Sequence, residues 1–291
     1  MLPNFLIVGA PKSGTSSLAR YLADHPDCWV VPEKELRFFD LHYDLGLDWY
    51  RDRFAAAGGE RAVGEATPTY LFHTHAHARI ARTLPDARLI AILRNPVDRA
   101  YSHYWHWRER NGEPRSFEQV VEDELAGKAD QTDATWHPDA PETFPYFDQG
   151  CYAEQLENLT RHVPREQILV LLFEDLSERP VEAFREACRF LELDESVVPG
   201  SVGRVENAFR YYYPRWLWGL FVRVEIGRFL PGRAAAANYR AMVREADPYP
   251  PIDPAVRERL TEHFAPGVEA LERWLERDLS AWKRRPIAVS A

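Results

Sequence analysis

Short apolar runs recur along the first two thirds of the chain, and stretches with helical periodicity separate them. Residues 88–93 form the strongest run, whose almost continuous apolar character is typical of a strand buried on both faces. Similar runs predict strands at 5–8, 28–31, 61–65 and 167–173. Apolar residues spaced three and four apart predict helices at 15–23, 76–84, from 95 onward, and at 117–125, 152–162 and 180–191. This alternation predicts an α/β fold, a P-loop-like three-layer sandwich with a doubly wound, mostly parallel sheet.

Beyond residue 200 the pattern changes to helices alone. The periodicity predicts helices at 214–229, 234–244, 254–264 and 267–275, which we expect to cover the same domain. We therefore expect a single domain over 1–291, with a core over about 1–195 and a helical C-terminal part over about 200–285. The polar, proline-rich stretch 126–149 is predicted to be a lid or an insertion.

Composition narrows the classes of function. Hydrophobic residues make up 45% and charged residues 28% of the 291 residues, which is ordinary for a globular protein. A net charge of −9 argues against a general nucleic-acid binder, which needs a basic face for phosphates. Three widely separated cysteines predict neither a disulfide framework nor a zinc site and favour the cytoplasm. The first predicted strand starts close to Met1 and no apolar run would span a bilayer, so we expect neither a signal peptide nor a transmembrane segment.

The loop between the first strand and the first helix carries the clearest chemical signal. Gly9 and Gly14 have the spacing of a phosphate-binding P-loop, but Thr15 stands at the position of the usual lysine, and the lysine lies inside the loop. Main-chain N–H groups and the helix dipole make such a helix start a site for phosphate or sulfate. Thr15 and Ser16 would look the same as ordinary helix caps. The predicted anion-binding residues are Pro11, Lys12, Ser13, Gly14, Thr15, Ser16 and Ser17.

Arg94 follows the strongest predicted strand, where a nucleotide kinase would place an aspartate for Mg²⁺. An arginine there suits a bidentate grip on an additional phosphate of the nucleotide. Ser102 lies eight residues further on, about two helical turns. The rival interpretation is a P-loop kinase or NTPase in which Glu174 and Asp175 hold the metal. Its weakness is the missing Gly-Lys-Ser/Thr sequence.

A charged and aromatic segment, residues 33–40, follows the second predicted strand. In an open parallel sheet ligands bind outside the carboxyl ends of the strands, so we expect this segment to face the loop. Four carboxylates compete for the role of general base: Glu33, Glu35, Asp40 and Glu65. For each of them a salt-bridge role is as plausible as catalysis. The aromatic stretch 209–218 either lines an acceptor site or packs at a helix surface or an oligomer interface.

Four segments spread over the chain resemble the PAPS-dependent sulfotransferases: residues 11–18, 93–102, 173–176 and 279–282. Segment 33–40 is most similar to the heparan sulfate-type sulfotransferase domains and their bacterial relatives. The resemblance implies in-line transfer of a sulfuryl group from 3′-phosphoadenosine 5′-phosphosulfate (PAPS) to a hydroxyl or amine. The nucleotide product is then 3′-phosphoadenosine 5′-phosphate (PAP).

The resemblance also implies roles for single residues. Glu35 takes the position of the general base, and Lys12 neutralises the charge of the leaving nucleotide. Arg94 and Ser102 take the two positions that bind the 3′-phosphate. Because Lys12 and Arg94 supply positive charge, we expect no metal requirement.

Two positions depart from the family pattern, since Arg37 replaces a common histidine and Ala66 a common lysine. A module that binds PAP without catalysis therefore stays open as an alternative. The expected acceptor is a small molecule, a carbohydrate or a carrier-bound intermediate, and the expected partners include a second copy in a homodimer but no nucleic acid. The residues assigned to the acceptor side are Arg37, Asp40, His103, Trp107 and Tyr211. For Trp107, buried packing is the alternative.

Overall fold

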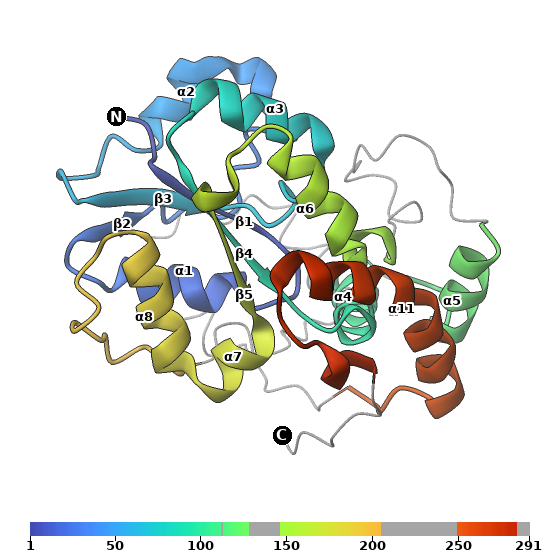
Figure 1. Cartoon of the computed structure of the whole chain (residues 1–291). Coiled ribbons are helices and arrows are strands. Elements are labelled where there is room, and N and C mark those ends of the chain that lie inside the picture. Colours follow the sequence, from blue (N-terminus) through green and yellow to red (C-terminus); the bar gives the residue numbers. More distant parts are fainter. Residues whose placement is uncertain (112, 128–145, 205–248, 284–291) are drawn as a thin grey trace, which may run out of the picture. The chain divides into compact units, whose positions relative to one another are not determined.

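The computed structural model describes residues 1–111, 113–127, 146–204 and 249–283 (Figure 1). Contacts divide the chain into two compact units, Met1–Val205 with Ile252–Ser290, and Glu206–Pro251 with the last residue. All elements described below belong to the first unit. The helices expected at 214–229 and 234–244, the aromatic stretch 209–218 and most of the expected lid at 126–149 lie outside the described residues.

A five-stranded parallel sheet forms the centre of the first unit. Its strands are β1 (Phe5–Gly9), β2 (Cys28–Val30), β3 (Ala62–Ala66), β4 (Arg88–Leu93) and β5 (Ile168–Leu172), in the order β2-β3-β1-β4-β5. Each pair of adjacent strands is parallel. The five predicted strands are confirmed to within one residue at each end, and the described sheet is wholly rather than mostly parallel.

Apolar side chains alternate between the two faces of the sheet and form a core on each. In β1, Phe5 and Ile7 belong to one core, and Leu6 and Val8 to the other. The first core includes side chains of α1 (Thr15–Ala23), α7 (Phe173–Glu178) and α8 (Pro180–Phe190). The second includes those of α2 (Gly46–Asp52), α3 (Thr74–Thr83), α4 (Pro96–Asn111), α5 (Phe117–Leu125), α6 (Tyr152–Thr160) and α11 (Pro254–Leu275). Figure 1 shows α1 and α8 on one side of the strands and α2, α3 and α6 on the other, which confirms the three-layer architecture.

The last helix corrects one prediction. The sequence predicts separate helices at 254–264 and 267–275, but α11 runs without a break from Pro254 to Leu275 with Pro266 inside it. A proline removes one main-chain hydrogen bond and crowds the preceding turn. The helix continues because buried side chains on both sides of the proline pack on the unit, where α11 contacts α4 and α6: Val256, Leu260, Phe264, Val268 and Leu271.

Two short helices, α2 and α7, escape the sequence-based prediction. Only Tyr50 is buried among the seven residues of α2, so no apolar period is visible. Helix α7 follows β5 without a connecting residue, and Phe173 therefore looks like the end of the strand. Both helices position residues at the site described below, because Tyr50 and Phe173 each contact a charged group there.

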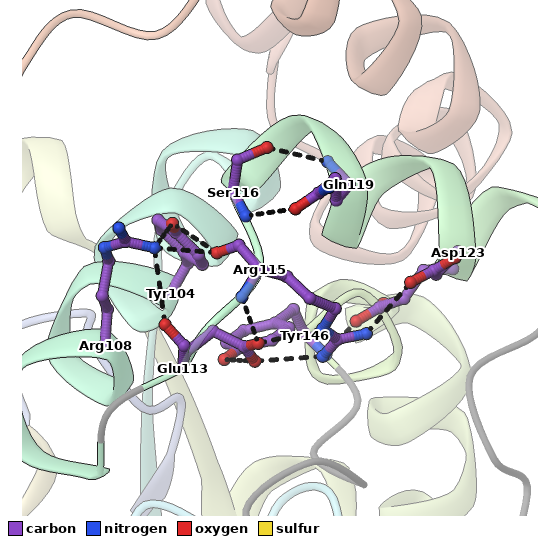
Figure 2. Close-up of polar contacts among 9 residues, drawn as sticks. Tyr104, Arg108, Glu113, Arg115, Ser116, Gln119, Asp123 and Tyr146 are labelled. Carbon is purple, nitrogen blue, oxygen red and sulfur yellow. Dashed lines mark hydrogen bonds and ion pairs between the residues drawn. The ribbon is translucent and has the colours of Figure 1, made fainter.

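A polar network holds the connection between α4 and α5 (Figure 2). Glu113 is buried and accepts hydrogen bonds from the Arg115 guanidinium at 2.9 and 3.0 Å and from the Tyr146 hydroxyl at 3.1 Å. Tyr104 and Arg108 of α4 donate to the main-chain oxygen of Arg115 at 2.9 and 2.8 Å. The buried charge of Glu113 is thus neutralised, and α4 is tied to the start of α5 and to Tyr146.

The cysteines are free thiols, and two of them are buried on the α1 and α8 side of the sheet: Cys28 and Cys188. Burial raises the pKa of the Cys188 thiol to about 12, so it stays protonated and unreactive. In the described part of the chain, no helix has the length and apolar character needed to cross a membrane.

Candidate active site

The carboxyl ends of all five strands lie at one edge of the sheet, and a segment with candidate chemistry follows each. Residues 10–14 follow β1, residues 31–40 follow β2, and residues 67–70 follow β3. Arg94 follows β4 and Phe173 follows β5. Because β1 lies between β3 and β4, the loop has the candidate bases on one side and Arg94 on the other.

The loop after β1 has a backbone shaped for an anion. Lys12 and Gly14 have φ values of 68° and 91°, in the left-handed region. A Cβ atom at Gly14 would lie 2.9 Å from the Leu176 side chain, so both the backbone and the surroundings require glycine. Gly14 is the N-cap of α1 and brings no side-chain cap to the first-turn N–H groups. Ser13 is fully buried beside them, and its hydroxyl finds no hydrogen-bond partner in the described residues.

Two contacts hold Arg94 beside this loop. Its Nη1 donates to the main-chain oxygen of Lys12 at 3.2 Å, and its guanidinium carbon lies 4.5 Å from the centre of the Phe173 ring. The same ring packs under Gly14, where it would lie 3.3 Å from an added Cβ atom. The Phe173 ring therefore supports both Arg94 and the loop. Ser102 lies further along, buried on α4.

The acidic pair after β5 is engaged within the protein. Glu174 Oε1 accepts from the Trp282 indole at 3.1 Å and from the main-chain N–H of Asn95 at 3.5 Å, and burial raises the pKa of Glu174. Asp175 pairs with Arg179 and, at 2.6 Å, with Arg277. This arrangement ties α7 and the residues after α11 to the start of α4. It gives no support to a metal-binding role, and the described residues contain no group of three or more potential metal ligands.

The four candidate bases differ sharply in their surroundings. Glu65 is fully buried, and the Asp40 side chain is also inaccessible. Glu33 is exposed but pairs with Arg53 at 3.6 Å. Glu35 is exposed at the carboxyl end of β2, in the segment that follows the strand. Accessibility therefore favours Glu35 over Asp40 and Glu65 as a group that meets an acceptor.

Arg37 and Asp40 form a close pair in the same segment as Glu35. Arg37 donates to Asp40 Oδ2 from Nε at 3.0 Å and from Nη2 at 2.7 Å, and only 12% of the Arg37 side chain is exposed. The Thr69 hydroxyl donates to the same oxygen at 2.6 Å. Much of the Arg37 charge is thus neutralised within the protein, although the sequence analysis assigned Arg37 to the acceptor side.

Three basic side chains of α3, which the sequence analysis missed, contact residues 39–43. His75 Nε2 lies 3.0 Å from the main-chain oxygen of Asp40, and Arg79 donates to that of Phe39 at 2.8 Å. Arg82 donates to the Tyr43 hydroxyl at 3.0 Å. Residues 75, 79 and 82 are spaced four and three apart, so they lie on one face of α3. This helical spacing of basic residues was the signal available in the sequence.

Lys34 is a second residue that sequence reasoning missed. Its ammonium donates a hydrogen bond to the Ser16 hydroxyl at the start of α1. This contact joins the segment after β2 directly to the anion loop after β1. A lysine beside Glu35 in a dense charged segment was the only indication, and such lysines are usually solvated.

Two residues assigned to the acceptor side lie in the protein interior. His103 is buried, with Nδ1 3.2 Å from Arg99 Nη1 and its ring centre 5.3 Å from that of Tyr146, and burial lowers its pKa far below the ordinary value. Trp107 belongs to the core between α4 and its neighbours, as the packing alternative has it. Tyr211 lies outside the described residues.

An anion loop at a helix start, an arginine held beside it and an exposed carboxylate lie at the same sheet edge, a combination expected of a nucleotide-dependent group transferase. The chain belongs to the sulfotransferase family, because the family model "Sulfotransferase domain" matches residues 2–212. The family expected from the sequence motifs is thereby confirmed.

The curated relatives share only part of their length with this chain. Human heparan sulfate glucosamine 3-O-sulfotransferase 3B1 is 34% identical over 193 residues, which cover 66% of this chain and 46% of that protein. The membrane-associated sulfotransferase kil1 of Dictyostelium discoideum is 26% identical over 266 residues, covering 66% of this chain and 56% of that protein. The chain thus spans about half the length of the curated relatives it matches.

A solved structure covers the chain more fully. The crystal structure of a sulfotransferase from Alicyclobacillus acidocaldarius has a TM-score of 0.73 and 32% sequence identity, and the match covers 98% of this chain and 100% of that one. The sulfotransferase domain of the Synechococcus PCC 7002 olefin synthase has a TM-score of 0.50 at 16% identity, which shows a shared fold. The expected fold is therefore also that of sulfotransferases.

Proposed function

We propose that this sulfotransferase-family protein moves a sulfuryl group from PAPS to a hydroxyl or amine acceptor, with PAP as the product. The observation that carries the proposal is the placement of Arg94 against Lys12. A second cation beside a phosphate loop suits a nucleotide with two separate phosphate groups, and PAPS is such a nucleotide. Membership of the family points to the same cofactor.

In this proposal the loop of residues 11–17 binds the 5′-phosphosulfate end. The N–H groups at the start of α1 and the Lys12 ammonium stabilise the negative charge that grows on the leaving nucleotide. Arg94 and Ser102 bind the 3′-phosphate. Lys34, which reaches Ser16, adds a further positive charge on the acceptor side of the loop. Catalysis then consists of positioning and charge stabilisation, without a covalent enzyme intermediate.

Glu35 acts as the general base in this scheme. Its carboxylate accepts the proton of the acceptor hydroxyl while the acceptor oxygen forms a bond to sulfur and the bond from sulfur to the 5′-phosphate oxygen breaks. Its exposure and its place next to Lys34 support this role. Asp40 holds Arg37 and does not meet the acceptor.

A carbohydrate hydroxyl is the first acceptor to test, since relatives at 34% identity are named as heparan sulfate 3-O-sulfotransferases. Small alcohols and carrier-bound intermediates remain in the acceptor screen. A cytoplasmic location, which the free cysteines favour, and a homodimer stay predictions.

Calorimetric titration of the full chain with PAP, 5′-AMP, and ATP with Mg²⁺ tests the cofactor. We expect PAP to bind most tightly, and Arg94→Ala to weaken PAP roughly 10- to 100-fold while leaving 5′-AMP almost unchanged. Arg88→Ala is the matched control, because Arg88 begins the strand that Arg94 follows and pairs with Glu192 at the other end. Preference for ATP with Mg²⁺ would return the kinase hypothesis to first place.

Radiolabelled PAPS tests the reaction itself. We expect label to move to a desulfated heparan oligosaccharide or to another hydroxyl compound in the screen, and Glu35→Gln to stop the transfer while PAP still binds. Glu33→Gln serves as the control, since Glu33 is exposed two residues away. Tight PAP binding with no transfer to any acceptor would favour the alternative of an inactive PAP-binding module.

A further inference from the structure

The carboxylate of Glu65 lies at the end of β3 and is completely buried. Its Oε1 accepts hydrogen bonds from the Tyr50 hydroxyl at 2.9 Å and the Tyr70 hydroxyl at 2.8 Å. Its Oε2 accepts from the Thr67 hydroxyl at 2.6 Å. None of the ion pairs within the described residues involves Glu65, so three hydroxyl groups carry the whole task of solvating it.

Two of these three hydroxyls continue to the segment that bears Glu35. Thr67 Oγ1 accepts from the main-chain N–H of Arg37 at 3.3 Å, and the Tyr70 hydroxyl accepts from those of Phe38 and Phe39 at 2.9 and 3.4 Å. A hydroxyl that gives its single proton to Glu65 has only lone pairs left for these N–H groups. When Glu65 is ionised, every hydrogen bond in these two series therefore points toward its carboxylate.

The segment held in this way has an unusual backbone. Arg37 has a φ of 52°, in the left-handed region that a long side chain rarely adopts. Its main-chain oxygen accepts from the N–H groups of Leu41 and His42 at 2.9 Å. A strained residue persists only where its surroundings fix it, and the two hydroxyl chains from Glu65 supply part of that fixation.

We propose that Glu65 is the positioning residue of the site, which sets the place of the Glu35 carboxylate by orienting the Thr67 and Tyr70 hydroxyls under the main chain of residues 37–39. The inference rests on the proposed role of Glu35 as the base. It assigns Glu65 no contact with acceptor or cofactor.

Tyr50 and Tyr70 offer a matched pair of variants. Tyr50→Phe and Tyr70→Phe each remove one hydroxyl from Glu65 Oε1 and keep the aromatic ring in the core. Only the Tyr70 hydroxyl also reaches the segment of residues 37–39. A purely structural role for the cluster predicts equal effects of the two changes, whereas positioning predicts unequal ones.

Amide hydrogen exchange of the PAP-bound protein, read on peptides that cover residues 36–40, gives an answer that needs no acceptor. We expect Tyr70→Phe and Glu65→Gln to speed exchange in this segment at least roughly tenfold and Tyr50→Phe to leave it near the wild-type rate. Equal acceleration by both tyrosine variants, or none by Tyr70→Phe, would overturn the proposal. Should Glu65→Gln not fold, the tyrosine pair still decides.

Turnover of labelled PAPS completes the test. We expect Tyr70→Phe to lower kcat roughly tenfold or more at unchanged PAP affinity, and Tyr50→Phe to keep kcat within about threefold. Full kcat in Tyr70→Phe would contradict positioning, whatever Glu35 does. If Glu35→Gln retains full turnover, the proposed base is wrong, and the exchange experiment still reports on the Glu65 cluster separately.

Discussion

The Phe173 ring helps to fix the position of the Arg94 guanidinium. Its ring lies against the Arg94 guanidinium and under Gly14, so it supports both halves of the anion site. An arginine stacked on a ring loses less freedom when it binds a phosphate than one that samples solvent. The affinity for the 3′-phosphate should therefore depend on this ring.

We predict that Phe173→Leu weakens PAP binding about 2- to 5-fold, the loss expected for one cation–π contact. Binding of 5′-AMP, which lacks the 3′-phosphate, should change much less. Phe173→Tyr is the control, because it keeps a ring at this place. Calorimetry with both nucleotides decides, and an equal loss for PAP and 5′-AMP would show that the ring acts on the loop alone.

For Lys34 we predict an equal effect on the two nucleotides, in contrast to the selective effect predicted for Phe173. Its ammonium contacts Ser16 at the start of α1, on the 5′ side of the proposed nucleotide site. We predict that Lys34→Met weakens PAP and 5′-AMP by the same factor, roughly 3- to 10-fold. Lys283→Met, which removes a lysine that pairs with Glu272, is the control. A selective loss of PAP binding would place Lys34 near the 3′-phosphate instead.

At the residue scale the sequence predicted the cationic groups better than their partners. Lys12 and Arg94 stand out because glycine spacing and a strand end mark their positions. The burial of His103 depends on contacts between segments, which no local pattern reveals, whereas Arg37 and Asp40 pair within one segment, three residues apart. For the same reason Glu65 looked like a candidate base until its three hydroxyl partners and its burial were seen.

At the scale of elements, periodicity located the strands almost to the residue, because β1 is a fully buried apolar run and the other four are mostly apolar runs between turn residues. It failed where tertiary packing overrides local preference. Pro266 predicts a break, yet α11 continues because residues on both sides of it are anchored in one core. The prediction missed helix α2 because only one of its residues is buried, so its sequence shows no apolar period.

The continuity of α11 yields a prediction for its proline. Pro266 is exposed, so Pro266→Ala restores a main-chain donor and relieves crowding without changing the core. We expect the free energy of unfolding to rise by about 1–2 kcal/mol, less than the full cost of an interior proline because the unfolded chain also gains freedom. Urea denaturation measures it, with exposed Glu269→Ala as the control. A lower stability would mean that the proline shapes a bend that the packing needs.

At the scale of the whole molecule, buried ionisable groups of both kinds set the response to pH. Burial raises the pKa of Glu65 and of Glu124 to about 7. Burial lowers the pKa of His73 and of His77 to about 4. Between about pH 4.5 and 6.5 the two pairs change the free energy of unfolding in opposite directions as pH rises. The glutamates keep protons in the folded chain that the unfolded chain releases, so they lower stability with rising pH. The histidines stay neutral in the folded chain while the unfolded chain binds protons, so they raise stability with rising pH.

Removing one glutamate should reveal this balance. The contribution of Glu124 is fully present below its ordinary pKa and is lost as pH rises through about 7, by up to roughly 3 kcal/mol. Glu124→Gln cannot titrate, so we predict that the stability advantage of the wild type over this variant shrinks steadily from pH 5 to pH 8 in urea denaturation. Glu122→Gln, which changes an exposed neighbour on α5, is the matched control. A constant difference for Glu124→Gln would mean that this carboxyl keeps its ordinary pKa, and that the hydrogen bonds from the main chain of Tyr146 and Phe147 compensate its loss of water in full.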